Sequence, residues 1–297
     1  MALGKIKIPV HFFPLLATVF WGFSFIWSTL LLKYYQPVTI IFFRLILSSL
    51  FLFFILKFFW QKERIKRKDM PLLFISAVFN PFLYFLGENY GLKFSSPTIA
   101  SVIIATIPVF TPLIAYMFVK EKLAFINFVG IGISFGGVIT ILIQRGSSFE
   151  INLPGILFLF GAVASALCYS VLLKKLITRY SALVLVAYQN FIGIFLFLPI
   201  FFFFEAGSFS VAHLNFTTIS SFLLLSILAS SLSYVFFAHS IKILGISKTN
   251  IYTNMIPVFT AFFSFFLSLE SFTPQKIAGI ILVIAGVYLS ERTSRHR

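Results

Sequence analysis

Arg44 and Glu88 are two ionisable residues that lie inside long apolar stretches of the chain. If such a stretch crosses a membrane as a helix, a charge within it is costly and marks a functional site or an interior pairing. At 1.5 Å per residue, both residues lie within a few turns of the same membrane face. Three interpretations follow: a fixed ion pair, a site for a substrate ammonium group or for proton coupling at Glu88, or side chains that reach the headgroups separately.

Polar residues at helical spacing form further candidate surfaces. Asn80, Tyr84 and Glu88 are four residues apart and share one helix face. The predicted pathway residues are Trp21, Ser24, Asn80, Tyr84, Glu88, Tyr234, Asn250 and Asn254. A cavity lined by such aromatic and small polar groups would suit a neutral or zwitterionic amphiphile. Serine-rich helix faces also serve helix packing, so that alternative stays open for the segment around Tyr234.

Motifs for other chemistry are absent from the sequence. It has no HExxH zinc motif, no Walker A loop, and a single aspartate, Asp69, in a basic segment. We therefore predict no metal site, no cofactor and no enzymatic activity. The single Cys168 excludes an intramolecular disulfide.

The composition indicates that lipid is the solvent for much of this chain. Of its 297 residues, 60% are hydrophobic and only 10% are charged, whereas soluble domains carry about 25% charged residues. Long continuous apolar runs favour helices over barrel strands. Ten segments of about 20 residues can be distinguished. They are 12–32, 39–59, 71–92, 97–119, 125–144, 154–174, 182–204, 217–240, 246–268 and 275–291.

The basic residues orient these ten segments. With the N-terminus in the cytoplasm, most Lys and Arg residues fall in cytoplasmic segments, and only Lys33, Lys93, Arg145 and Lys276 fall on the other side. This asymmetry predicts that both termini are cytoplasmic. The net charge of +15 then indicates contact with anionic lipid headgroups of the bilayer, and we predict no nucleic-acid partner.

An internal repeat relates the two halves of the chain, 1–146 and 147–297. The segment Ile107–Thr111 recurs, residue for residue, as Ile256–Thr260, and at the same offset Gly130 matches Gly279 and Gly137 matches Gly286. Each half holds five predicted spans, an odd number, so the second half enters the membrane from the opposite side. Inverted repeats of this kind are an architecture for alternating access to a site near the membrane midplane.

The repeated residues include prolines and glycines with separate predicted roles. Pro108 and Pro257 remove a helical hydrogen bond, so they predict kinks that either shape packing or bend the spans around a pathway. Gly130 and Gly137, like Gly279 and Gly286, are seven residues apart and share a helix face, which predicts close helix packing. Gly132 and Gly136 add a GxxxG pattern to the same span.

These motifs together resemble the drug/metabolite transporter superfamily, in its ten-helix EamA branch. The resemblance rests on Trp21-Gly22, on the segment Glu88–Lys93, on the two Pro-Val-Phe-Thr segments with the following Glu121 and Glu270, and on the glycine-rich fifth and tenth spans. It implies a bacterial inner-membrane permease, often an exporter of amino acids or other metabolites, with the fifth and tenth spans outside the central cavity. The sequence departs from this pattern in the sixth span, where Cys168-Tyr169 stands near the place of Trp-Gly.

The predicted function is therefore secondary transport of a small molecule across the membrane. The predicted fold is all-α, with ten transmembrane helices in two inverted five-helix repeats. A passive facilitator or channel for small solutes is the alternative. The protein is expected to act as a monomer or a homodimer, and the pattern names neither the substrate nor the direction of transport.

Overall fold

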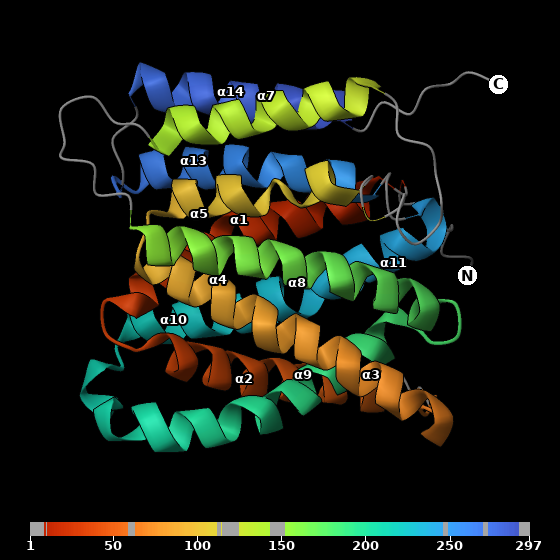
Figure 1. The fold of residues 1–297 in the computed structure, drawn as a ribbon. Coiled ribbons are helices and arrows are strands. Elements are labelled where there is room, and N and C mark those ends of the chain that lie inside the picture. Colours follow the sequence, from red (N-terminus) through yellow and green to blue (C-terminus); the bar gives the residue numbers. More distant parts are fainter. Residues whose placement is uncertain are drawn as a thin grey trace, which may run out of the picture.

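The computed structural model describes residue 9 and residues 11–58, 63–111, 114, 125–142, 152–245, 249–269 and 273–290. In these ranges the chain forms helices joined by turns and contains no β-strand. Figure 1 shows the helices stacked with their axes along one common direction. The prediction of an all-helical fold is confirmed for this part of the chain.

Helices follow one another with short connections. Up to residue 142 they are α1 (Phe12–Leu32), α2 (Pro37–Phe58), η1 (Arg67–Asp69), α3 (Met70–Ala77), η2 (Val78–Leu83), α4 (Tyr84–Lys93), α5 (Pro97–Ile104) and α7 (Phe125–Leu142). From residue 153 they are α8 (Leu153–Ile177), α9 (Ala182–Ile200), η3 (Phe201–Glu205), η4 (Ala206–Ser208), η5 (Val211–His213), α10 (Phe216–Leu224), η6 (Leu225–Leu232), α11 (Ser233–Leu244), η7 (Ile251–Met255), α13 (Ile256–Phe266) and α14 (Pro274–Ser290).

Six helical segments among the described residues are long and apolar enough to cross a membrane. They are Phe12–Leu32, Pro37–Phe58, Arg67–Lys93, Leu153–Ile177, Ala182–Ser208 and Phe216–Leu244. Shorter apolar helices occur at Pro97–Thr111, Phe128–Thr140 and Pro274–Gly286. The chain is thus a multi-pass membrane protein. Parts of five predicted spans, as well as Glu121 and Glu270, lie outside the described residues.

The outer surface agrees with a lipid environment. Large apolar side chains point outward all along the bundle; Phe54 is 68% exposed, Phe203 84% and Phe216 88%. Soluble proteins rarely expose contiguous apolar surface on this scale. Acyl chains of a bilayer are a suitable solvent for such a surface, so the exposed phenylalanines stabilise the inserted state.

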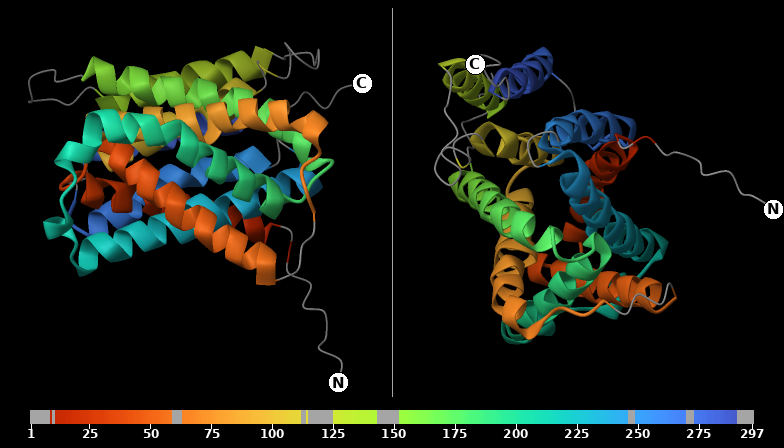
Figure 2. Two further views of the ribbon diagram at one scale, coloured as in Figure 1. Left: turned by 90° about the horizontal axis from the view of Figure 1, so that it is seen from below. Right: turned by 90° about the vertical axis from the view of Figure 1, so that its right-hand side faces the viewer.

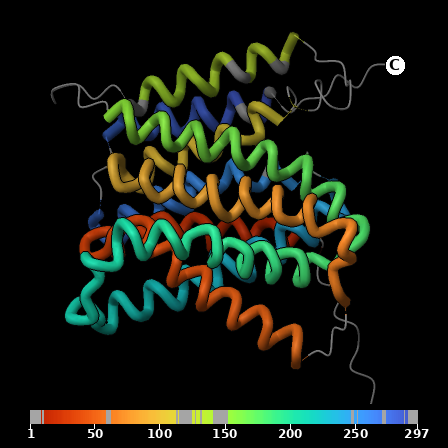
Figure 3. The backbone as a smooth tube through the Cα atoms, turned by 60° about the horizontal axis from the view of Figure 1, so that its bottom comes forward, coloured from red at the N-terminus to blue at the C-terminus, as the bar shows by residue number. Residues whose placement is uncertain are grey.

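The helices pack in pairs that join distant parts of the sequence. Helix α2 lies against α9, α4 against α8, and α1 against both α11 and α13. Figures 2 and 3 show the same bundle from other sides, with α7 and α14 forming a pair at one edge. The centre of the molecule is therefore enclosed by helices from both ends of the chain.

The α7–α14 pair packs through glycines from each helix. A Cβ atom on Gly137 would lie 2.7 Å from the Val283 nitrogen and 2.8 Å from the Gly279 carbonyl oxygen, and one on Gly286 would lie 2.7 Å from the Gly130 oxygen. The backbones therefore approach too closely for any side chain at these two positions. By contrast, a Cβ atom on Gly132 or Gly136 would meet no described atom within 4 Å, so the predicted GxxxG pattern does not face this contact.

Two of the long helical segments change their winding midway. Between α3 and α4 the backbone leaves helical geometry at Asn80, which has φ −145° and ψ 118°, and Pro81 follows without an N–H group to donate. The spacing of Asn80, Tyr84 and Glu88 predicted that all three lie on one face of a continuous helix. This prediction is wrong for Asn80, because the helix is broken at that residue. Between α10 and α11 the chain is π-helical over Leu225–Leu232, where the hydroxyls of Ser230, Ser231 and Ser233 reach carbonyls five residues earlier.

Candidate functional site

A small cavity lies near the centre of the bundle, where several of these helix breaks come together. Its lining residues are Trp21, Asn80, Tyr84, Ile104, Ile107, Ala166, Tyr169, Ser170, Tyr234, Phe237, Asn250, Thr253 and Ile256. The free volume is about 50 Å³, which has room for a few water molecules only. A metabolite would require the surrounding helices to move apart.

Trp21 forms one wall of the cavity and is fixed from several directions. Its ring packs edge-on against Tyr234 and Phe237, with centroids 5.2 and 5.0 Å apart. The indole N–H donates a 3.2 Å hydrogen bond to the carbonyl of Ala229, inside the π-helical segment η6. The carbonyl that accepts the indole hydrogen bond therefore lies within the π-helical part of this span.

Gly22, the neighbour of Trp21, lets α13 approach α1 closely. A Cβ atom on Gly22 would lie 2.6 Å from the Cβ atom of Phe259. The hydroxyl of Thr260 donates a 3.1 Å hydrogen bond to the Gly22 carbonyl. This contact holds α1 against a helix from the far end of the sequence, and it explains why the Trp21-Gly22 pair needs a glycine.

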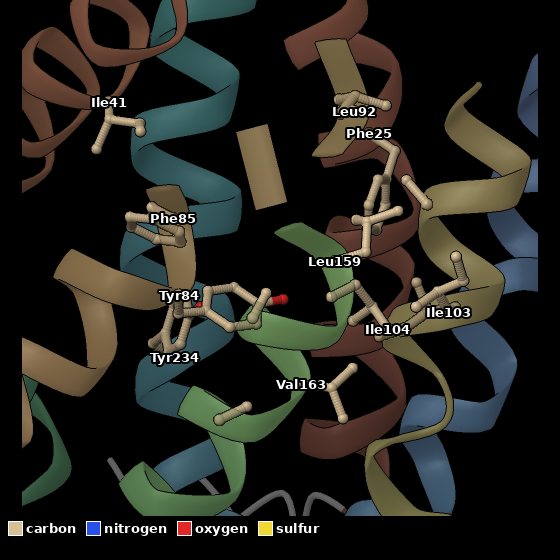
Figure 4. Close-up of a cluster of buried hydrophobic side chains, with 14 of the residues drawn as sticks. Phe25, Ile41, Tyr84, Phe85, Leu92, Ile103, Ile104, Leu159, Val163 and Tyr234 are labelled. Carbon is tan, nitrogen blue, oxygen red and sulfur yellow. The ribbon is translucent and has the colours of Figure 1, made fainter. Parts of the chain in front are cut away.

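Next to Trp21, two tyrosines and an asparagine, Tyr84, Tyr234 and Asn80, form another part of the lining. The Asn80 side chain donates a 3.2 Å hydrogen bond to the Tyr234 hydroxyl oxygen. Figure 4 shows Tyr84, Phe85 and Tyr234 close together in the same buried cluster. Because Asn80 stands where the helix is broken, its side chain can reach α11 and also face the cavity.

Further lining residues lie where α-helical geometry is interrupted in the spans containing Pro108 and Pro257. Helix α5 ends at Ile104, a turn covers Ala105 and Thr106, and helical geometry resumes at Ile107. In the repeated segment, the 3₁₀ turn η7 precedes α13, which has Pro257 in its first turn. Both prolines therefore follow a break rather than bend a continuous helix. Asn250 links the two regions by a 3.2 Å hydrogen bond to the Thr111 hydroxyl.

The ion pair of Arg44 and Glu88 lies behind the cavity wall. Arg44 Nη1 is 3.6 Å from Glu88 Oε2, and the two residues are 1% and 7% exposed. Arg44 Nε donates a 2.6 Å hydrogen bond to the Ser230 hydroxyl, and the guanidinium lies 3.9 Å from the centre of the Phe85 ring. Buried charges persist only when they are paired and hydrogen-bonded in this way.

Not all predicted pathway residues reach the cavity. Trp21, Asn80, Tyr84, Tyr234 and Asn250 line it. The hydroxyl of Ser24 instead donates to the Trp21 carbonyl within α1. Glu88 does not line the cavity and instead accepts a hydrogen bond from the lining residue Tyr84. Asn254 is buried and does not line the cavity either.

Three polar lining residues were not selected from the sequence: Tyr169, Ser170 and Thr253. The Tyr169 hydroxyl donates a 3.2 Å hydrogen bond to Gln189 Oε1 of α9. A lone tyrosine in an apolar segment is a weak signal. Its position near the place of the first half's Trp-Gly pair was the available hint.

Among the described residues, no three His, Cys, Asp or Glu side chains come together as metal ligands.

The family is shown by the sequence over almost the whole of this bundle. The pattern of the EamA-like transporter family matches residues 8–143 and again residues 153–292. The chain belongs to this family. The predicted membership in the drug/metabolite transporter superfamily is confirmed, and the name of the family indicates a transporter.

Relatives of known sequence carry names of the same kind. An uncharacterized transporter of Archaeoglobus fulgidus is 26% identical over 93% of this chain and 96% of its own length. The uncharacterized transporter YvbV of Bacillus subtilis is 25% identical over 93% and 90%. A probable terminal-alkyne amino-acid exporter of Streptantibioticus cattleyicolor is 24% identical over 79% of this chain and 77% of its own.

A solved crystal structure supports the fold. It superposes on this EamA-family chain with a TM-score of 0.67, covering 92% of this chain and 97% of the other, at 14% sequence identity. At that identity the likeness concerns the arrangement of helices alone.

Proposed function

We propose that the protein is a secondary transporter that moves a small metabolite by alternating access through the central cavity. The observation that carries this proposal is the composition of the cavity wall. Trp21, Asn80 and Tyr84 come from the first part of the chain, and Tyr169, Tyr234 and Asn250 come from the second. A site shared between two halves can be opened to one membrane face or the other by relative movement of those halves.

The proposal includes ten transmembrane helices in two inverted five-helix repeats, 1–146 and 147–297. Besides the six long spans, the shorter apolar helices at Pro97–Thr111, Phe128–Thr140 and Pro274–Gly286, together with the α13 segment, supply the remaining four. The repeated Ile-Pro-Val-Phe-Thr segments and the glycine pairs of α7 and α14 support this division.

The chemistry of the lining favours a substrate without net charge. The described lining residues present two carboxamides, of Asn80 and Asn250, with tyrosine, serine and threonine hydroxyls between aromatic and aliphatic walls, and none of these described residues carries a charge. Amides and hydroxyls can satisfy the polar groups of an amino acid or a similar amphiphile, while the rings cover its apolar part. The similarity to a probable amino-acid exporter agrees with this substrate class and with export.

The position of the protein in the cell is part of the same proposal. The excess of Lys and Arg at the end of the bundle that includes Lys66, Lys174 and Arg179 supports an inner-membrane protein with both termini in the cytoplasm. A monomer would contain the complete cavity, and a homodimer is compatible with it.

Counterflow in proteoliposomes tests the function directly. The purified protein would be reconstituted with a high internal concentration of one unlabelled compound, and uptake of the labelled compound measured, for a panel of aromatic, aliphatic and hydroxylated neutral amino acids. We expect saturable, transiently concentrative uptake of at least one member. Flux that does not saturate would instead indicate the passive facilitator. The double variant Asn80→Ala/Asn250→Ala should abolish uptake without loss of folded protein.

A further inference from the structure

Glu205 is a buried carboxylate outside the cavity lining, and it binds the start of another helix. It ends η3, the π-helical extension of α9, and is 5% exposed. Its carboxylate accepts hydrogen bonds from the backbone N–H groups of Val38 at 3.2 Å and Thr39 at 2.6 Å, in the first turn of α2. The Thr39 hydroxyl adds a 2.9 Å bond and the Tyr90 hydroxyl a 3.4 Å bond.

Glu63 makes the equivalent contact at the other end of the bundle. It lies in the segment after α2, and both of its carboxylate oxygens accept from the backbone N–H of Ser181, at 3.2 and 3.0 Å. Ser181 is the N-cap of α9, and its hydroxyl accepts from the Val184 N–H in turn. The carboxylate after α2 therefore holds the start of α9, and the carboxylate after α9 holds the start of α2.

The two contacts are physically alike and both are favourable. The first N–H groups of a helix have no partner within the helix, and the helix dipole places partial positive charge at the same point. A carboxylate there forms charge-assisted hydrogen bonds. Separating Glu205 from α2 would leave a buried charge and several donors without partners, which is costly. Helices α2 and α9 pack along each other between these two ends.

The position of α2 and α9 in the bundle indicates what the contacts do. Neither helix contributes a residue to the cavity wall. In an alternating-access carrier, contacts that close a gate at one face are broken in the state open to that face. The Glu63 and Glu205 contacts lie at opposite ends of α2 and α9, and the two helices pack along each other between them, so neither end can open without separating the whole pair.

We infer that Glu63 and Glu205 form a reciprocal join between α2 and α9 that stays closed at both ends throughout transport. The remaining helices around the cavity move relative to this fixed pair. Glu63 and Glu205 are thus positioning residues for the transport cycle. They contact neither the cavity nor its contents. The inference goes beyond the proposed function, and its first test requires no substrate.

Hydrogen–deuterium exchange of the wild-type protein in lipid nanodiscs tests the join. The backbone amides of Val38, Thr39 and Ser181 should exchange their hydrogens as slowly as the amides around Leu45, in the buried middle of α2. Exchange of either group as fast as that of the turn Val211–His213 would overturn the inference, because a gating contact opens during the cycle.

Two single variants serve as controls for each other in the same experiment. Glu205→Gln should accelerate exchange at Val38 and Thr39 by about tenfold or more, and leave Ser181 unchanged, since one charged hydrogen-bond partner is lost. Glu63→Gln should accelerate exchange at Ser181 only. Equal acceleration at both ends in either variant would indicate general loosening of the fold and would contradict separate joins.

Cross-linking adds a functional readout. In a Cys168→Ala background, Thr39→Cys and Glu205→Cys would be bridged by a short thiol-reactive cross-linker, and counterflow measured for the amino acid that the wild type carries. Uptake by the bridged protein should be at least that of its unbridged form, which lacks the Glu205 carboxylate. Uptake lost on bridging and present in the unbridged form would refute the join. If the wild type carried no panel member, the proposed function would fail, and the exchange experiment would still decide on the join.

Discussion

The Tyr84 hydroxyl donates a 3.1 Å hydrogen bond to Glu88 Oε1, and this contact connects the cavity wall to the buried ion pair behind it. Tyr84 lines the cavity, Glu88 does not, and Arg44 lies beyond Glu88 at 3.6 Å. The ion pair therefore acts on the cavity through the orientation of a tyrosine. This geometry favours a fixed structural pair among the interpretations that the sequence left open.

Neutralising one member of the ion pair should destabilise the protein more than neutralising both. Glu88→Gln leaves the buried Arg44 charge uncompensated, at a cost of about 3 kcal/mol or more in unfolding free energy. The double variant Arg44→Gln/Glu88→Gln removes that charge and should recover much of the loss. Thermal unfolding of the purified protein measures both.

The pH profile of transport separates this structural role from proton coupling at Glu88. If the pair is structural, Glu88→Gln lowers the amount of active protein and keeps the pH profile of uptake per folded molecule. If uptake becomes independent of pH in Glu88→Gln, and also in the double variant Arg44→Gln/Glu88→Gln, proton coupling is assigned to this carboxylate.

Removing the Tyr84 hydroxyl should weaken substrate binding, because it deletes the hydrogen bond to Glu88 that orients the ring in the cavity wall. Tyr84→Phe keeps the ring itself and deletes this one bond, whose net contribution is about 1 kcal/mol. We expect the KM of counterflow to rise about fivefold, which corresponds to that free energy. Tyr34→Phe, an exposed tyrosine outside the cavity, is the matched control and should leave KM unchanged. An unchanged KM in Tyr84→Phe would remove this hydroxyl from the proposed site.

The sequence predicted those features that depend on local composition. Apolar length predicted the helical spans, and the rise per residue placed Arg44 and Glu88 at one depth. Helical spacing was less informative for single side chains. Ser24 shares a helix face with Trp21, yet its hydroxyl is satisfied by the Trp21 carbonyl, because a serine in a helix can bond its own backbone.

Other features depend on contacts between distant segments, and no local pattern indicates them. Glu63 contacts Ser181, 118 positions away in the sequence, and Glu205 contacts Thr39, 166 positions away. Tyr169 is one tyrosine in an apolar helix until Gln189 and the cavity are brought beside it. The break at Asn80 likewise requires a partner on α11 to give it a role.

Replacing both prolines that the internal repeat shares should slow the movement that exposes the cavity. Pro108 and Pro257 follow breaks whose neighbours, Ile107 and Ile256, line the cavity. Alanine at both positions restores N–H donors and favours continuous helices. We expect the turnover rate of counterflow to fall about tenfold, equivalent to about 1.4 kcal/mol in the barrier, with unchanged thermal stability. Full turnover in the double variant would limit the prolines to packing.

The glycines of α7 provide a test with an internal control on the same helix. Gly137→Ala would place a methyl group 2.7 Å from the Val283 nitrogen and 2.8 Å from the Gly279 oxygen, so α14 must shift away. Overpacking of this kind costs about 1–3 kcal/mol. Gly132→Ala adds the same methyl group where no described atom lies within 4 Å, and alanine favours the helix. The first variant should unfold at a lower temperature than the wild type and the second should not; equal melting temperatures for the two variants would contradict close packing of α7 on α14.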